Sequence, residues 1–174
     1  MHSISRVLLI AASLVACTTA APAADPPPPA DVFAALDGNW SGVLEYADYR
    51  TDRRVQLVTR LTADASDDGR TLTMAYVYTE PNGENVTSQG VHRIDLPAGR
   101  YVMGDDTFDI GMVEGFTSAA GGRMVVTGTV IDNDRPEPAR HTITLSGDTL
   151  RMLKETRSPW QFRNEYRLVR VTNP

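Results

Sequence analysis

The sequence has little cysteine, and this limits how its folded part can be stabilised. Cys17 is the only cysteine in the 174 residues, so no disulfide can form within the chain. No stretch after the first 16 residues approaches the ~20 apolar residues of a membrane-spanning helix. Any folded domain therefore depends on its own hydrophobic core.

Positive charge is also scarce. The chain carries a net charge of −5, with 22 acidic residues against 17 basic ones. A mildly acidic domain is a poor partner for nucleic acid or for an anionic membrane surface. The charge therefore argues against a nucleic-acid-binding function, and the only membrane attachment we expect is through a lipid anchor.

Common catalytic and metal-binding motifs are missing. There is no G-x-S-x-G elbow, no phosphate-binding glycine loop and no cysteine nucleophile in the domain. His92 and His141 are the only histidines beyond the first 16 residues, and their spacing does not match a metal site. Asp105 and Asp106 adjoin, so on a strand they would face opposite sides. We therefore predict neither a metal nor a cofactor.

The first 16 residues have the pattern of a signal peptide. Arg6 precedes an uncharged, mostly apolar run of ten residues, 7–16, which is too short to span a bilayer. The segment Leu14-Val15-Ala16-Cys17 resembles the lipobox of bacterial lipoproteins, which implies lipidation of Cys17 and a membrane lipoprotein facing the periplasm. The alternative is an ordinary cleavage near Ala23, which would give a soluble periplasmic or secreted protein.

The remaining chain divides into a tether and one domain. Residues 17–30 are rich in proline and alanine and lack core-forming residues, which is typical of an extended linker. Residues 31–174 form the predicted domain. It begins with a short helix over 32–36, which Asp31 can cap and Gly38 can end.

From Trp40 onward the apolar residues alternate with polar ones, and turn residues interrupt the pattern every 8–12 residues. This predicts an all-β domain without crossover helices, either a sandwich or, because the turns are short, an antiparallel up-and-down barrel of about 8–10 strands. We expect the segment 133–138 to be an irregular loop. The predicted strands cover residues 40–46, 55–63, 71–79, 85–95, 100–104, 107–115, 123–132, 139–146, 149–155 and 161–171.

Gly38-Asn39-Trp40 resembles the G-x-W signature at the start of the first strand in the calycin superfamily, which includes lipocalins and fatty-acid-binding proteins. Gly38-Asn39-Trp40-Ser41-Gly42 is also similar to the opening of bacterial nitrobindin-like barrels. In calycins a basic residue of the last strand packs over the tryptophan. The resemblance therefore implies a structural latch between Trp40 and Arg170 or Arg167. Alternation favours Arg170, which shares a face with Phe162, while Arg163 lies on the other face. Nitrobindins bind haem through a histidine near the C-terminus, and no histidine follows His141, which argues against haem.

Three functions remain open. The first is an envelope lipoprotein that binds a small apolar or amphipathic molecule inside the barrel. The second is a structural or interaction protein of the envelope with a filled barrel. The third and weakest is an enzyme that uses His92 or His141 as acid–base with a tyrosine. For the first function, the predicted ligand-binding residues are Tyr46, Met74, Tyr76, Tyr78 and His141.

Overall fold

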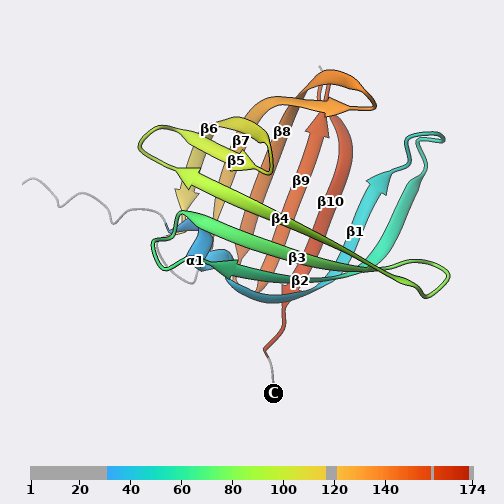
Figure 1. Cartoon of the computed structure of the whole chain (residues 1–174), viewed down its shortest axis with the longest axis horizontal. Helices are drawn as coiled ribbons and strands as arrows, with labels where there is room; N and C mark the ends of the chain where they lie inside the picture. The colour runs from blue at the N-terminus through green and yellow to red at the C-terminus, as the bar shows by residue number, and fades with distance from the viewer. Residues whose placement is uncertain (1–30, 117–120, 158, 173–174) are drawn as a thin grey trace, which may run out of the picture.

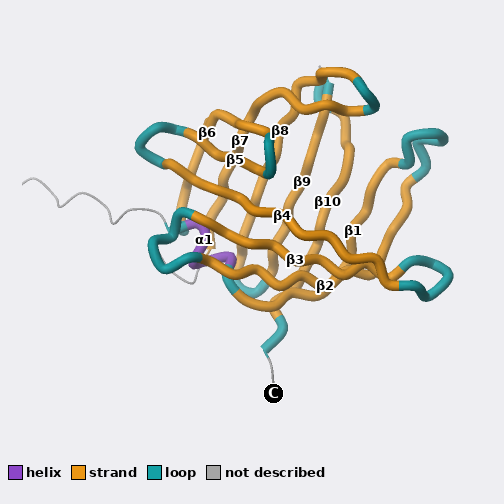
Figure 2. Tube along the Cα trace, in the orientation of Figure 1, coloured by secondary structure: helices purple, strands orange, loops and turns teal. Residues whose placement is uncertain are grey.

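The computed structural model describes residues 31–116, 121–157 and 159–172. The described chain is one short helix followed by ten antiparallel strands that close into an up-and-down barrel (Figures 1 and 2). Each strand pairs with its sequence neighbours, and the first strand also pairs with the last. The elements are α1 (Val32–Leu36), β1 (Gly38–Ala47), β2 (Arg54–Ala65), β3 (Thr71–Thr79), β4 (Asn85–Asp95), β5 (Arg100–Met103), β6 (Asp106–Gly115), β7 (Gly121–Asp132), β8 (Arg135–Ser146), β9 (Thr149–Thr156) and β10 (Gln161–Arg170).

The predicted fold class is confirmed. The barrel is all-β and antiparallel, and the helix occupies the predicted residues 32–36. Ten strands stand where the alternation placed them, because a sheet that curls around an interior needs apolar side chains on one face only. The predicted signal peptide over residues 1–16, the lipidated Cys17 and the tether over 17–30 lie outside the described residues.

Helix α1 closes one end of the barrel (Figure 1). The Asp31 carboxylate caps it by accepting a hydrogen bond from Ala34 N at 3.1 Å, which satisfies one of the free amides of the first turn. Its apolar face, formed by Val32, Phe33 and Leu36, is fully buried against the barrel interior. No helix among the described residues is long and apolar enough to cross a membrane.

The interior is densely filled in the half next to α1. Buried side chains from almost every strand meet there, and their burial supplies the main stabilising free energy. The largest of them are Trp40, Leu61, Leu72, Met74, Tyr101, Phe108, Met124, Leu150 and Leu168. The other half contains a cavity.

The expected irregular loop over 133–138 is wrong. The turn comprises only Asn133 and Asp134, and β8 begins at Arg135, so Pro136 and Pro138 lie within a strand. Residues 135–138 pair with β7 but not with β9, and prolines are tolerated where their missing N–H faces away from the paired strand. The Pro138 carbonyl indeed faces away from β7, because it accepts a hydrogen bond from Arg157 N at 2.9 Å.

A β-bulge reverses the predicted faces at the start of β10. The register with β9 shifts between Phe162 and Asn164, so Phe162 faces outward under Arg54, whose guanidinium lies 3.3 Å from the ring centroid. Arg163 is buried and pairs with Asp132 at 3.3 Å, contrary to the expected alternation. One extra residue moves the side chains before it to the opposite face, which simple alternation cannot anticipate.

Candidate functional site

A cavity of about 260 Å³ lies inside the barrel, in the half away from α1. Tyr78 and Ser88 mark its position, because they stand near the turn between β3 and β4, opposite the helix end. The described residues that line it mix apolar, aromatic, polar and basic side chains, with no acidic residue among them. The lining residues are Tyr76, Tyr78, Ser88, Gln89, Gly90, His92, Met103, His141, Thr142, Ile143, Met152, Leu153, Lys154, Asn164 and Tyr166.

Three tyrosines form one wall of the cavity. Tyr76 and Tyr78 stack with their ring centroids 5.7 Å apart, and Tyr166 tilts against Tyr76 at 5.2 Å. The hydroxyls of Tyr78 and Tyr166 are 2.8 Å apart and share one hydrogen bond, while Tyr76 donates to the Met74 sulfur at 3.5 Å. Burial raises the pKa of each of these phenols, so all three remain neutral. The wall is therefore aromatic and uncharged.

His92 lies at the inner side of the cavity. Its Nδ1 is 2.6 Å from the hydroxyl of Tyr101, which is fully buried and whose pKa is raised by that burial. The Tyr101 hydroxyl makes no other hydrogen bond to the described residues. We therefore assign the arrangement that satisfies both groups, in which the phenol donates to Nδ1 and the imidazole proton is on Nε2. A Cβ on Gly90, another cavity residue, would be 3.6 Å from that Nε2. His92 therefore presents an N–H donor towards Gly90.

His141 faces the same cavity from β8. Its ring contacts Phe108 edge-on at 5.0 Å, and its buried Nε2 has no hydrogen-bond partner in the described part of the chain. Burial, aided by the positive charge of Lys154, lowers the pKa of His141 to about 3, and burial lowers the pKa of His92 to about 4. Both imidazoles are therefore neutral at pH 7.

Lys154, the only lysine of the chain, lies in the cavity wall on β9. Across the described residues no carboxylate lies within 4.0 Å of its ammonium group. Its pKa is lowered by burial, and the more distant Asp132 and Asp106 oppose that shift. Asp132 is already engaged, because it accepts a hydrogen bond from Tyr49 at 2.8 Å and pairs with Arg163. Within the part of the chain that the structure describes, Lys154 is thus the one charged side chain lining the cavity, and it has no close counter-ion.

Of the five predicted ligand-binding residues, Tyr76, Tyr78 and His141 line the cavity. Tyr46 and Met74 do not: Met74 is buried in the filled half, and Tyr46 is only partly buried near the end of β1. Lys154 and Asn164, which also line the cavity, were not among the predicted ligand-binding residues. The spacing in the sequence could have identified Lys154. It follows Leu150 and Met152 at intervals of two residues, so it lies on the same inward face of the strand as these apolar side chains.

Trp40 and Arg170 meet at the closed end. The Arg170 guanidinium lies 4.1 Å from the Trp40 ring centroid, and the indole Nε1 donates to Leu36 O at 2.9 Å. Arg170 also donates to the carbonyls of Asp37 and, at 2.8 Å, Ala35. The contact thus joins the last strand, the first strand and α1 at one point, away from the cavity. Arg167 instead points outward.

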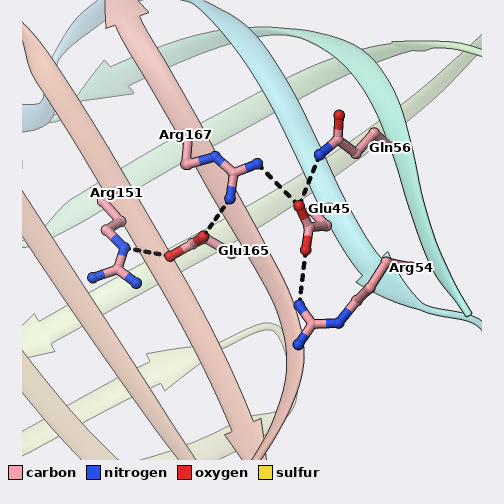
Figure 3. Close-up of polar contacts among 6 residues, drawn as sticks. All are labelled: Glu45, Arg54, Gln56, Arg151, Glu165 and Arg167. Carbon is pink, nitrogen blue, oxygen red and sulfur yellow. Dashed lines mark hydrogen bonds and ion pairs between the residues drawn. The ribbon is translucent and has the colours of Figure 1, made fainter. Parts of the chain in front are cut away.

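The outer wall carries an alternating row of charges where β1 meets β10 (Figure 3). Glu45 and Glu165 are directly opposed across this strand pair, an arrangement that by itself repels. Arg167 offsets the repulsion by bonding Glu45 at 3.0 Å and Glu165 at 2.7 Å. The row extends to Arg151, which bonds Glu165, and to Arg54 and Gln56, which bond Glu45 at 2.8 Å. These hydrogen bonds, first that of Gln56 and then that of Arg167, lower the pKa of Glu45.

The chain matches no protein-family model, and no curated protein is significantly similar to it. The described residues contain no group of three or more His, Cys, Asp or Glu side chains placed to hold a metal ion.

Proposed function

We propose that the protein is a calycin-like binding barrel that holds a small amphipathic molecule in the cavity next to Tyr76, Tyr78 and His141. The observation that carries this proposal is the half-filled interior: one half of the barrel is densely packed, and the other holds a cavity of about 260 Å³. This volume is just below the ~300 Å³ at which pockets for drug-sized ligands begin. The ligand is therefore small.

The surroundings of His92 and His141 favour ligand binding over acid–base catalysis. His92 does contact a tyrosine at 2.6 Å, as an acid–base pair would. However, that Tyr101 is 0 % exposed and cannot reach a bound molecule. Both histidines are also weak bases, because burial holds the pKa of His92 at about 4 and that of His141 at about 3. Efficient general bases have a pKa near the working pH.

Filling the cavity is expected to abolish binding. Gly90 lines the cavity, has no positive φ, and a Cβ there meets nothing closer than 3.6 Å, so Gly90→Leu places its side chain in the empty space. Native mass spectrometry of protein purified from its own host is expected to show a retained small molecule on the wild type and none on Gly90→Leu.

Gly111→Leu is the matched control, because Gly111 is exposed, does not line the cavity, and a Cβ there has 3.7 Å of clearance. This variant should retain the molecule as the wild type does. A wild type that carries no molecule and takes up none from extracts of its host would contradict the proposed function.

We further propose that the barrel is a lipoprotein of the bacterial envelope, attached through a lipid on Cys17. The support is sequence-based: a ten-residue apolar run ends at a lipobox-like segment, and Cys17 is the only cysteine of the chain. The segment 18–30 would then separate the barrel from the bilayer. At ~3.1 Å per residue, an extended proline-rich segment of this length spans up to ~40 Å.

The anchor has a direct test. We expect Cys17→Ala to move the protein from the membrane fraction to the soluble fraction of its host and to abolish labelling by an alkyne fatty acid. Thr18→Ala, next to the cysteine, should leave both unchanged. A Cys17→Ala protein that still fractionates with membranes would rule out this attachment while leaving the binding function untouched.

A further inference from the structure

The charge inside the cavity is opposite in sign to the charge of the whole protein. The chain carries −5 overall, yet among the described residues the cavity lining includes Lys154 and no Asp or Glu. Water screens surface charges strongly but screens partly buried charges much less. A charged ligand inside the barrel therefore experiences Lys154 more strongly than the acidic residues of the outer surface.

Neutral polar groups that line the same cavity as Lys154 add further hydrogen-bond donors. His92 presents its Nε2 proton, as argued above from its bond to Tyr101. Within the Tyr78–Tyr166 pair, one hydroxyl donates to the other, which leaves the second proton free for another acceptor. The Asn164 side chain, which also lines the cavity, adds an amide N–H₂. These groups together match a ligand group that accepts several hydrogen bonds and carries negative charge.

The tyrosine wall of the same cavity suits an aromatic ring. Tyr76 and Tyr78 are stacked within 7° of parallel, and Tyr166 lies 5.2 Å from Tyr76, so flat apolar surfaces border the space. Aromatic pairs gain beyond the area that they bury when they stack or meet edge to face. Met103, Ile143 and Met152 complete the apolar part of the lining.

We propose, building on the binding function above, that the cavity selects small aromatic carboxylates, with the carboxylate at Lys154 and the ring against the three tyrosines. The bound anion supplies the counter-ion that Lys154 does not find among the described residues, and it stabilises the ammonium form against the cost of burial. The cavity volume limits the ligand to about one ring with a short side chain.

Three ligands of nearly equal shape test the charge preference. Phenylacetate, phenylacetamide and 2-phenylethylammonium differ mainly in the charge of the polar end, and isothermal titration calorimetry at pH 7 measures their binding to the wild type. We expect phenylacetate to bind at least tenfold more tightly than phenylacetamide, because a charge-assisted hydrogen bond is stronger than a neutral one. The ammonium compound should bind most weakly of the three.

Variants at one position then assign the preference to Lys154. Lys154→Met keeps the length of the side chain without its charge and should reduce the ratio between phenylacetate and phenylacetamide to about one. Lys154→Arg should retain the preference. Arg60→Met removes a positive charge from an exposed site on β2 and should leave the ratio as in the wild type. Circular dichroism of each variant verifies that the barrel is folded.

The outcomes separate this inference from the function on which it rests. Equal or tighter binding of phenylacetamide or of the ammonium compound overturns the carboxylate preference, although the barrel still binds small molecules. Failure of all three to bind also overturns it, and native mass spectrometry then decides whether the cavity holds another molecule. An unchanged ratio in Lys154→Met rules out Lys154 as the selecting group.

Discussion

Replacing Trp40 with alanine is expected to lower the free energy of unfolding by about 3–5 kcal/mol. Trp40 is 1 % exposed, and its removal leaves a large void between α1 and the barrel. It also leaves the Leu36 carbonyl without the indole donor, and Arg170 without the ring on which it lies. Globular domains are stable by only ~5–15 kcal/mol, so this loss brings the protein close to unfolding. Urea unfolding followed by far-ultraviolet circular dichroism measures the change.

The second tryptophan of the chain provides the matched control. Trp160 is 38 % exposed and lies with its ring centroid 4.8 Å from the Arg140 guanidinium, so Trp160→Ala removes a surface contact. Such contacts contribute ~0.5–1 kcal/mol, and we expect a loss of that size. If the two variants were equally stable, Trp40 would not be the residue that joins the helix to the barrel.

The second large effect is a loss of stability in acid caused by His141. In the unfolded chain this histidine titrates near 6.5, whereas burial lowers its pKa in the folded barrel to about 3. Below pH 6.5 His141 is therefore protonated in the unfolded state but not in the folded state. The free energy of unfolding then falls as the pH decreases, by at most ~1.4 kcal/mol per pH unit. The loss continues until the folded pKa is reached. We expect His141→Phe to remove this component.

The comparison is made by urea unfolding at pH 7.0 and pH 4.5. Between pH 7.0 and pH 4.5 the free energy of unfolding of the wild type should fall by about 2 kcal/mol more than that of His141→Phe. The carboxylates titrate alike in both proteins, so the difference reports on His141. At pH 7 it should be no less stable, because the buried Nε2 that it removes has no partner among the described residues.

His92→Phe should behave differently at pH 7, where it loses about 1–3 kcal/mol by leaving the buried Tyr101 hydroxyl unpaired. A wild type and a His141→Phe variant with the same dependence on pH would show that His141 is not buried as a neutral base.

The alternation of side chains was sufficient to predict an antiparallel β domain, and the short turns favoured a barrel over a sandwich. Residues such as Leu57, Leu61, Leu72 and Met74 follow the period of two closely, so the ten strands and the direction of their side chains followed from the sequence. The pattern fails where the backbone departs from a regular ladder. Whether a bulge forms at Arg163, and whether prolines are tolerated in β8, depends on which neighbouring strand each residue pairs with. The local sequence pattern does not show this pairing.

The cavity was predicted only in part, for a different reason. Alternation identifies which side chains point inward, but it does not say where they fill the interior and where they leave space. Tyr76 and Met74 stand on the same face of β3, yet Met74 is fully packed while Tyr76 borders the cavity. The difference arises from the side chains that approach from strands far away in the sequence, among them Lys154 and Tyr166.

The pairing of β1 with β10 has a consequence for how the chain acquires its shape. All other strand pairs join neighbours in the sequence and can form as hairpins, but this one links residues such as Trp40 and Arg170 that are 130 positions apart. Contacts of such separation are slow to form, because a long loop must be closed first. Until β10 has been synthesised and docked, β1 and β9 each expose an unpaired edge. The chain is therefore most exposed to aggregation before β1 pairs with β10 and closes the barrel. A chaperone that shields strand edges would act during this period.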